Sequence, residues 1–471
     1  MKRNIEKKLI EWKNSSFRKP LLIVGASHVG KTYVIENLFG PSNFSKVLKV
    51  DFRSDSQARK FVKNHPDAKA ILEYLSLRFS LQITSDTLLF FDEIQEATQI
   101  LTAAKYFKQD YPQIPVIMAG SLVRTRLKQM ESDNSENVMR LDPEIEKDNQ
   151  DGHNNFLFPV GMLDELDMYP MTFDEFLNSY NPSLYSLIKQ SLLDEKNLDS
   201  SYHQMAMDSF STYLQVGGMP EAVSIYLKEK SVLLAQQRLQ TIFKDYLSDM
   251  GLYQISSQTI ARSRMVFESV YLQLDKENKN FKISAIEKGK RLRDYLSPFD
   301  WLTLARLVNR SYLVKERVSL PLKPEAESLF RIYLPDCGLF TYESKINLAS
   351  FIDSLNNNTL SGIFMENYVS EELKARGIPL FYWKGKTSSE FEFVINIDNH
   401  VIPIDCKKNK GSLNSLEVFQ RYNQYDFSIK VSQNKYGYNQ EKKILTLPFY
   451  LLPFYLDEMI NKGRIQPTYD I

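Results

Sequence analysis

Short apolar runs separated by helix-length stretches fill the first 120 residues of the chain. The runs lie at residues 21–24, 47–52, 88–91 and 116–119. Runs that are apolar at every position are typical of strands buried on both faces, as in parallel sheets covered by helices on each side. The pattern predicts an α/β domain built on a parallel sheet, for which we set the limits at residues 1–180.

The pattern changes twice after this region. From about residue 173 to residue 318 the apolar positions follow helical spacing, interrupted by Gly-Gly-Met-Pro at 217–220. After Phe330 strand-like runs dominate, and a helix-like stretch at 362–375 lies among them. The strand-like runs lie at 331–334, 380–383, 390–396, 401–406 and 443–447. We therefore predict a helical middle domain over 181–325 and a C-terminal α/β domain over 326–471.

One acidic segment differs from its surroundings. Residues 131–151 carry eight acidic and two basic side chains and no aromatic residue. Such a composition buries too little apolar surface to offset the entropy lost on ordering. We predict a surface insertion in the first domain, with limits at 124–157. A solvated loop and an acidic gate that mimics nucleic acid are both open readings of it.

The first apolar run is followed at once by a glycine-rich phosphate-binding pattern. The pattern GxxxxGK[ST] is formed by Gly25, Ala26, Ser27, His28, Val29, Gly30, Lys31 and Thr32. In such a loop, backbone N–H groups and the N-terminus of the next helix hold phosphate oxygens. We expect Lys31 to reach the β and γ phosphates of ATP and Thr32 to place its hydroxyl on Mg²⁺.

The third and fourth apolar runs end in polar residues that suit nucleotide chemistry. Asp92 and Glu93 end the third run, and Ser121 follows the fourth. Strand ends of a parallel sheet open into the ligand crevice. We expect Asp92 to hold Mg²⁺, Glu93 to polarise the attacking water and Ser121 to sense the γ-phosphate. For Arg124 and Arg126, support of the phosphate, action on a neighbouring subunit's ATP and plain surface exposure are all open.

The overall composition limits the classes of partner. The chain has 59 Lys and Arg against 58 Asp and Glu, which gives a net charge of +1. This balance argues against a protein that is basic over its whole surface and binds polyanions in that way, so any basic face must be local. Region 276–317 is a local exception, with eleven basic and five acidic residues. Within it Trp301, Leu304, Leu307 and Val308 have the spacing of a buried helix face. The region is a candidate contact for DNA phosphates, and a solvated charged helix is the alternative.

Cysteine usage and hydropathy exclude further classes. Cys337 and Cys406 are the two cysteines, too few for a disulfide framework or a zinc cluster. A strongly apolar stretch at 444–456 contains two prolines and falls short of the roughly 20 residues that a membrane span needs. The N-terminus lacks an apolar signal core. We therefore expect a cytoplasmic protein.

Acidic residues of the C-terminal domain have the spacing of a nuclease site. Glu392 lies on one predicted strand, and Asp405 and Lys407 lie on the next, in the order that PD-(D/E)xK nucleases use. Alternation along a strand puts Asp405 and Lys407 on one face. With Glu366 on the preceding helix, these carboxylates could hold Mg²⁺ while Lys407 stabilises the attacking hydroxide. An active nuclease, a nuclease-like binding scaffold and plain surface charges are all open.

The motifs, in their order and spacing, look like those of an AAA-type ATPase of the ASCE class. Four further boxes continue the likeness, namely YPMTFDEFL at 169–177, GGMPEA at 217–222, IYLPDCGL at 332–339 and FMENYV at 364–369. This series is similar to a prokaryotic family with an N-terminal AAA-type ATPase domain and a C-terminal domain of restriction-endonuclease-like fold and unknown function. Met162 stands after Gly161 where the family usually has an arginine, and Ser27-His28 replaces Arg-Gln.

The resemblance implies a P-loop sheet domain, a helical lid with a winged helix in the middle, and a restriction-endonuclease-like C-terminal domain. It favours a protein that binds and hydrolyses ATP with Mg²⁺ and thereby controls how its other domains engage DNA or a protein partner. A homo-oligomer is compatible with this function. An ATP-dependent, Mg²⁺-dependent DNA nuclease and a non-hydrolytic, ATP-controlled protein-interaction switch are the alternatives.

Overall fold

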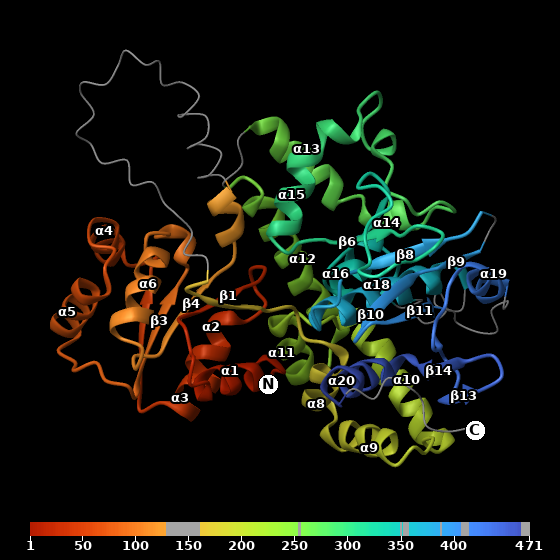
Figure 1. Ribbon diagram of the computed structural model, residues 1–471, viewed down its shortest axis with the longest axis horizontal. Helices are drawn as coiled ribbons and strands as arrows, with labels where there is room; N and C mark the ends of the chain where they lie inside the picture. The colour runs from red at the N-terminus through yellow and green to blue at the C-terminus, as the bar shows by residue number, and fades with distance from the viewer. Residues whose placement is uncertain are drawn as a thin grey trace. The chain divides into compact units, whose positions relative to one another are not determined.

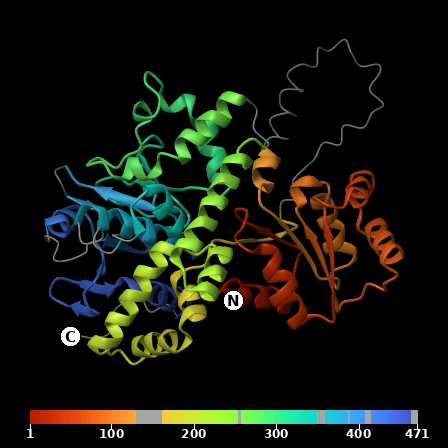
Figure 2. The same ribbon diagram turned by 180° about the vertical axis from the view of Figure 1, so that it is seen from behind.

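The computed structural model describes residues 1–128, 161–252, 256–348, 351, 358–386, 389–406 and 414–462. The chain divides into two compact units, shown in Figure 1 and from behind in Figure 2. Apart from Met1, the first unit comprises Lys2–Met168 and Met250–Ser257, and the second comprises Tyr169–Asp249 and Gln258–Ile471. In the described residues, no helix combines the length and the apolar character needed to cross a membrane.

A five-stranded parallel sheet forms the centre of the first unit, in the order β2-β3-β4-β1-β5. The strands are β1 (Leu21–Val24), β2 (Lys46–Asp51), β3 (Thr87–Asp92), β4 (Val116–Gly120) and β5 (Asp164–Asp167). Every residue of β1, β3 and β4 is buried, which explains why these strands are almost entirely apolar. The predicted parallel sheet and its first four strands are confirmed. Strand β4 lies between β1 and β3.

Helices pack on both faces of this sheet (Figure 1). Three of them, α4 (Ser56–Asn64), α5 (Ala68–Phe79) and α6 (Ile100–Asp110), share one buried core with alternate strand residues such as Leu89 and Phe91. The remaining helical elements are α1 (Ile5–Asn14), α2 (Lys31–Tyr33), the π-helix η1 (Val34–Phe39), α3 (Gly40–Asn43) and the 3₁₀-helix η2 (Ile94–Glu96).

Two local features of the first unit differ from the simple pattern. The helix after the phosphate-binding loop is α-helical only over Lys31–Tyr33 and continues as a π-helix over Val34–Phe39. Such π-helical stretches occur frequently at functional sites. Strand β5 reads Asp-Glu-Leu-Asp and is half exposed at the sheet edge, so its sequence lacks the apolar run that marks the other strands.

The second unit begins with a helical bundle. Four helices pack against one another, namely α10 (Ser200–Val216), α11 (Pro220–Glu229), α12 (Val232–Asp249) and α16 (Cys337–Ser344) (Figure 1). Helix α20 (Leu452–Lys462) packs against the two helices that precede α10, which are α8 (Phe173–Tyr180) and α9 (Pro182–Leu193). The other helical elements are α13 (Ser257–Phe267), α14 (Val270–Leu274), η3 (Ile283–Ala285), η4 (Leu292–Asp294), α15 (Leu296–Leu304), α18 (Asn358–Ala375), α19 (Asn414–Tyr422) and η6 (Phe449–Leu451).

Two sheets complete the second unit, in the orders β10-β11-β12-β14-β13 and β7-β6-β8-β9. The strands are β6 (Asn309–Leu313), β7 (Phe330–Tyr333), β8 (Phe381–Lys384), β9 (Glu390–Phe391), β10 (Phe393–Ile397), β11 (His400–Cys406), β12 (Ser428–Ser432), β13 (Gly437–Asn439) and β14 (Ile444–Pro448). All five predicted strand-like runs of this region coincide with strands, and the predicted helix coincides with α18. Strands β6, β12 and β13 were not predicted.

The sequence boxes after residue 168 meet in one buried polar network of the second unit. The backbone N–H of Gly218 donates to Asp336 Oδ2 at 2.6 Å, and that of Phe173 donates to Glu372 Oε1 at 2.8 Å. A Cβ on Gly218 would lie 1.9 Å from the carbonyl oxygen of Met171, so only glycine fits there. The boxes therefore hold helices α8, α10, α16 and α18 together.

This network also bears on the predicted domain limits. The prediction placed residues 1–180 in one domain, whereas the division into compact units assigns the segment from Tyr169 onwards to the second unit. Helix α8 of that segment is bound to α18 through Phe173 and Glu372. The helical bundle and the C-terminal sheets belong to one compact unit, and the predicted limits of three domains stay a prediction.

Two smaller predictions fare differently. Trp301, Leu307 and Val308 are buried as expected, but helix α15 ends at Leu304, so Leu307 and Val308 lie beyond it and the single helix face was wrong. Of the predicted insertion, residues 124–128 are helical and directly follow the end of β4. Residues 129–160, with the acidic segment, lie outside the described part of the chain.

Candidate functional site

The phosphate-binding loop joins β1 to α2 and its backbone needs both glycines. A Cβ on Gly25 would lie 2.3 Å from the carbonyl oxygen of Met168. Gly30 adopts a φ of 91°, in the left-handed region that glycine enters without strain. His28 also has a positive φ, of 67°. The predicted pattern thus corresponds to a tight loop that ends at the start of a helix.

Lys31 is the first residue of α2 and its side chain is buried, with 7% exposed. Its Nζ donates hydrogen bonds to the carbonyl oxygens of Gly25 at 3.0 Å and Ala26 at 2.8 Å. Burial lowers the pKa of Lys31 to about 8, although the charges of Glu93 and Asp92 oppose the shift. Because its hydrogen-bond partners are neutral carbonyls, an anionic oxygen would be a stronger partner for this ammonium.

Thr32 and Asp92 stand 60 positions apart in the sequence and meet at the end of β3. The hydroxyl of Thr32 donates to Asp92 Oδ2 at 2.8 Å. Lys49 of β2 approaches the same carboxylate oxygen at 3.5 Å and pairs with Glu36 at 3.0 Å. A hydroxyl and a carboxylate are the oxygen ligands that Mg²⁺ accepts. The two motifs therefore bring a candidate magnesium site together.

Glu93 directly follows β3 and adopts a left-handed conformation, with φ 54°. Its Oε2 accepts hydrogen bonds from Arg53 at 2.7 Å and from the side-chain amide of Gln95. Burial raises the pKa of Glu93, while the charge of Arg53 acts in the opposite direction. Arg53 and Gln95 therefore hold the carboxylate in place beside Asp92.

Ser121 is buried where β4 ends, one strand away from Asp92 and Glu93 in the sheet. The preceding Gly120 lies against the side chain of Gln95, because a Cβ there would meet Gln95 Oε1 at 2.3 Å. The ends of β3 and β4 are thus in direct contact. A sensor function of Ser121 stays a prediction.

The two arginines after β4 have different surroundings. Arg124 pairs with Glu165 at 2.8 Å and lies 3.7 Å from Asp167, both on the edge strand β5. Arg126 lies two residues further along the chain, in the same short helix over 123–128. Arg124 is therefore bound to carboxylates of its own unit, and a contact of either arginine with phosphate stays a prediction.

The second unit holds a buried charge cluster, by which we mean Lys279, Arg331, Glu366, Glu390 and Glu392. Glu366, on α18, contacts the ammonium of Lys279 through Oε1 and lies 4.0 Å from Arg331 through Oε2. Arg331 also pairs with Glu390 at 2.7 Å. Burial alone would lower the pKa of Lys279, but the charges of Glu366 and Glu392 raise it overall.

Glu392 and Asp405 lie at neighbouring strands of this unit. Strands β10 and β11 are antiparallel with Phe393 opposite Ile404, so the register continued by one position puts Glu392 opposite Asp405. Glu392 Oε2 accepts a hydrogen bond from the backbone N–H of Cys406 at 3.1 Å. Lys407, the fourth member of the predicted nuclease-like site, lies outside the described residues.

Cationic side chains lie at the helix glutamate of this predicted site. Within the described ranges, no group of three or more His, Cys, Asp and Glu side chains is placed to hold one. Glu366 instead faces the two cations Lys279 and Arg331. The predicted nuclease-like site thus has its helix glutamate engaged by cationic side chains, and no metal-dependent step is derived from it.

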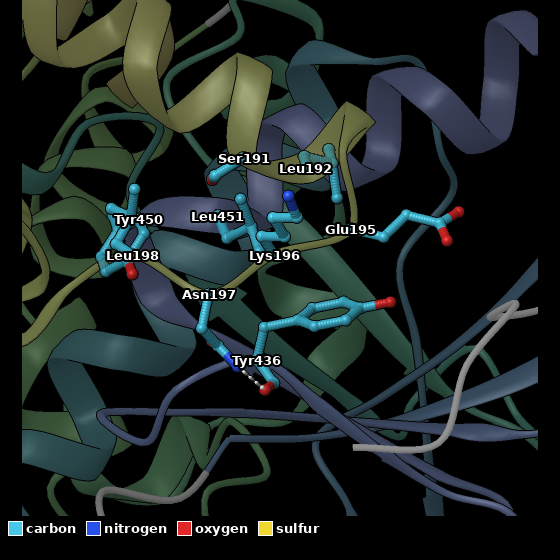
Figure 3. Close-up of a pocket in the computed structure, with 9 residues that line it drawn as sticks. All are labelled: Ser191, Leu192, Glu195, Lys196, Asn197, Leu198, Tyr436, Tyr450 and Leu451. Carbon is cyan, nitrogen blue, oxygen red and sulfur yellow. Dashed lines mark hydrogen bonds between the residues drawn. The ribbon is translucent and has the colours of Figure 1, made fainter.

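A small pocket of the second unit lies between the segment after α9 and η6 (Figure 3). Lys196, Asn197, Tyr436 and Tyr450 are among its lining residues. The side-chain amide of Asn197 donates to the carbonyl oxygen of Tyr436 at 2.9 Å, which ties the two sides together. No predicted site residue lines this pocket, so its position gives no support to the chemistry considered above.

Comparisons with known proteins bear on the first unit most directly. Residues 17–145 match the AAA domain family. Residues 207–350 and 361–450 match two domains of unknown function, DUF8612 and DUF4143. With the parallel sheet and the phosphate-binding loop, the first match supports an AAA-type ATPase domain in the first unit.

Two other comparisons complete the picture. The comparison with curated proteins gave no match. Among solved structures, the chain is similar to the Thermotoga maritima RuvB Holliday junction branch migration motor, at 15% sequence identity over 65% of this chain and 89% of that chain, with a TM-score of 0.26.

Sequence reasoning missed several residues that contact the predicted site of the AAA domain. Lys49 lies within β2 and Arg53 lies two residues after its end. Because β2 pairs with β3 and Asp51 stands opposite Asp92, the sequence next to that strand end could have indicated both residues. Gln95 stands two residues after Glu93, within reach of its carboxylate. Lys279 and Arg331 of the second unit carry no such signal, because only the tertiary fold brings them to Glu366.

Proposed function

We propose that the first unit is an AAA-type domain that binds ATP with Mg²⁺ and hydrolyses it. The contact between Thr32 and Asp92 carries this proposal, because it joins a hydroxyl and a carboxylate from two distant motifs at 2.8 Å. Lys31 stands directly beside Thr32 and begins the same helix. The match of residues 17–145 to the AAA domain family supports the same function.

Each residue has a distinct part in binding. The tight loop directs backbone N–H groups at the phosphates, and the start of α2 adds a partial positive charge. Lys31 exchanges the carbonyl oxygens of Gly25 and Ala26 for phosphate oxygens. Thr32 and Asp92 supply oxygen ligands for the magnesium ion, and Lys49 limits the negative charge at Asp92.

Hydrolysis then depends on Glu93. Bound ATP supplies the γ-phosphoryl group, and Mg²⁺ offsets the charge that develops on it. Glu93 orients the attacking water with an ionised carboxylate, which Arg53 keeps charged against the effect of burial. Gln95 fixes the direction of the carboxylate through its side-chain amide. To Ser121, at the end of the adjacent strand, we assign a response to the γ-phosphate.

The magnesium dependence of nucleotide turnover tests this proposal. Thr32→Val removes one oxygen ligand at constant size, so the Mg²⁺ concentration for half-maximal phosphate release rises at least about tenfold. Thr102→Val, on the surface-facing part of α6, is the matched control and keeps the wild-type value. Equal magnesium curves for wild type and Thr32→Val would remove Thr32 and Asp92 from the metal site.

A second part of the proposal is that the nucleotide state controls engagement of DNA by the second unit. The turn over 288–293 exposes Lys288, Lys290, Arg291 and Arg293. This turn is followed by α15 and by the antiparallel strands β6 and β7, an order compatible with a winged helix. Helix α15 contains no lysine or arginine, so we assign the phosphate contacts to the turn and expect little base readout.

The position of the basic turn is fixed from inside the unit. Arg262 pairs with Glu287 at 3.0 Å and donates to the carbonyl oxygen of Asp294 at 2.8 Å. Tyr295 donates to the same carboxylate of Glu287 at 2.8 Å. Both ends of the turn are therefore held, which lowers the entropy cost of presenting its cations to a polyanion.

Salt dependence distinguishes this engagement from the alternatives. We expect Lys290→Glu with Arg291→Glu to weaken binding of double-stranded DNA and to lower the slope of log affinity against log salt by about 2. Lys228→Glu, at an exposed site on α11, is the matched control. If the full chain with ATP fails to bind DNA at low salt, the partner is a protein. The nuclease alternative has less support, because Glu366 is engaged by Lys279.

A further inference from the structure

The buried charge cluster has an unusual arrangement of partners. Glu366 is 2% exposed and Arg331 is 1% exposed. Buried atoms Oε2 of Glu366 and Nε and Nη1 of Arg331 make no hydrogen bond with the described residues. Buried polar groups in proteins normally have hydrogen-bond partners. This site therefore departs from the rule, because one buried acceptor and two buried donors have none among the described residues.

The charges in the cluster nearly balance. Lys279 and Arg331 contribute two positive charges, and the carboxylates Glu366, Glu390 and Glu392 contribute three negative ones. Arg331 is further held by the ring of Tyr382, whose centroid lies 4.1 Å from its guanidinium carbon. A buried carboxylate without a cation is costly, so the buried carboxylates Glu366 and Glu392 need counter-charge, whereas Glu390 is partly exposed.

The two residues that follow Lys279 are held by hydrogen bonds, which fixes the position from which Lys279 reaches Glu366. The next residue, Asn280, accepts a hydrogen bond from the hydroxyl of Tyr382 at 2.7 Å. The residue after it, Phe281, donates through its backbone N–H to the carbonyl oxygen of Phe330 at 2.9 Å. The ammonium therefore reaches Glu366 from a fixed position on the edge of β7.

We propose that Lys279 is the built-in counter-cation of Glu366, and that its ammonium takes the place that a divalent cation would otherwise occupy beside Glu366 and the nearby Glu392. A lysine ammonium offers three donors and one charge, whereas Mg²⁺ or Mn²⁺ requires a near-octahedral set of oxygen ligands. The two occupants exclude each other. The second unit is then closed to divalent metal as long as Lys279 stays in the cluster.

Binding of Mn²⁺ to the full chain in the absence of nucleotide, followed by electron paramagnetic resonance of the free ion, tests this proposal. In the wild type we expect no Mn²⁺ site that depends on Glu366, so that Glu366→Gln leaves the titration unchanged. Lys279→Gln removes the charge at similar length, and we expect it to gain one Mn²⁺ per chain with at least tenfold higher affinity than the wild type. The double variant Lys279→Gln, Glu366→Gln loses this gain.

Two controls separate the proposal from general effects of charge. Lys282→Gln removes an exposed lysine from the same segment and gains no Mn²⁺. Lys279→Arg keeps the charge and also gains none. Melting temperature gives a second readout, since Mn²⁺ raises that of Lys279→Gln by more than it raises that of the wild type or of the double variant.

Two results would overturn the proposal. One is a Mn²⁺ site in the wild-type chain that Glu366→Gln or Glu392→Gln abolishes, because Lys279 then does not exclude the metal. The other is a folded Lys279→Gln variant with the wild-type titration. If Lys279→Gln does not fold, a wild-type Mn²⁺ site that Glu392→Gln abolishes would still overturn the proposal.

Discussion

Each unit buries a lysine beside acidic side chains, and the two lysines have opposite surroundings. In the AAA domain, Lys31 bonds to the neutral carbonyl oxygens of Gly25 and Ala26, and burial lowers its pKa to about 8. In the second unit, Lys279 contacts the carboxylate of Glu366, and the facing carboxylates raise its pKa.

The difference shows what each site is prepared to bind. Lys31 is charged but incompletely neutralised, so a phosphate improves its surroundings. Lys279 already has a counter-charge in Glu366. A further anion or cation would therefore bind weakly at this cluster as long as the ammonium of Lys279 stays beside that carboxylate. In our proposals the two clusters therefore serve different purposes, Lys31 in a ligand site and Lys279 as the counter-cation of a buried carboxylate.

The largest expected effect is on catalysis in the AAA domain. Glu93→Gln removes the carboxylate that orients water, and we expect phosphate release to fall about 10²- to 10⁴-fold. Nucleotide affinity stays within about threefold of the wild type, because Glu93 does not hold phosphate in the proposed mechanism. Measured release equal to the wild type would instead favour a non-hydrolytic switch.

The free energy of unfolding tests whether the two lysines differ in their contribution to stability. Glu366→Ala leaves Lys279 and Arg331 buried without this carboxylate, and we expect a loss of about 3–5 kcal/mol in denaturant unfolding. Lys31→Met removes a lysine that bonds only to neutral carbonyls, so a change within about 1 kcal/mol is expected. If Lys31→Met destabilises as much as Glu366→Ala, the contrast between the two lysines is wrong.

The lowered pKa of Lys31 predicts a pH dependence of nucleotide affinity. The bound triphosphate favours the ammonium, whereas free Lys31 loses its proton above a pKa of about 8. Affinity is therefore unaffected by this residue below pH 8 and falls as the pH rises through it, with proton uptake on binding. Titration calorimetry in two buffers of different ionisation enthalpy measures that uptake, which Lys31→Met abolishes.

A smaller effect is expected from the partner of Glu93. Arg53→Ala removes the charge that opposes the effect of burial, so the pKa of Glu93 rises further. The acid limb of the pH–rate profile for phosphate release moves to higher pH, while the rate on the plateau changes little. Arg59→Ala is the control, because Arg59 faces Glu96 at 3.9 Å instead of Glu93. If the acid limb of Arg53→Ala stays at the wild-type pH, the ionisation of Glu93 does not control the rate of phosphate release.

The fold of the AAA domain was predictable where local sequence carries the signal. Strands β1, β3 and β4 are buried on both faces, so their residues are almost all apolar and their limits can be read directly. The phosphate-binding loop was found for the same reason, since Gly25 and Gly30 are demanded by local backbone geometry. Edge strand β5 escaped because half of it faces solvent.

Long-range pairing was the part that sequence could not supply. The boxes at 217–222 and 332–339 were recognisable, but their function in holding helices together depends on contacts such as Gly218 with Asp336. Likewise, the spacing of Glu366, Glu392 and Asp405 indicated a nuclease-like site. Lys279 lies more than 80 positions before Glu366 and contacts it in the folded chain. No local sequence pattern indicates this contact, so its effect on the chemistry of the site could not be predicted.

Equilibrium binding of a fluorescent ATP analogue to the full chain at millimolar Mg²⁺ tests the central claim most directly. The account predicts one saturable site per chain in the wild type and at least a tenfold weaker site in Lys31→Ala, with both proteins folded. Equal binding by the two proteins, or no binding by the wild type, would contradict it.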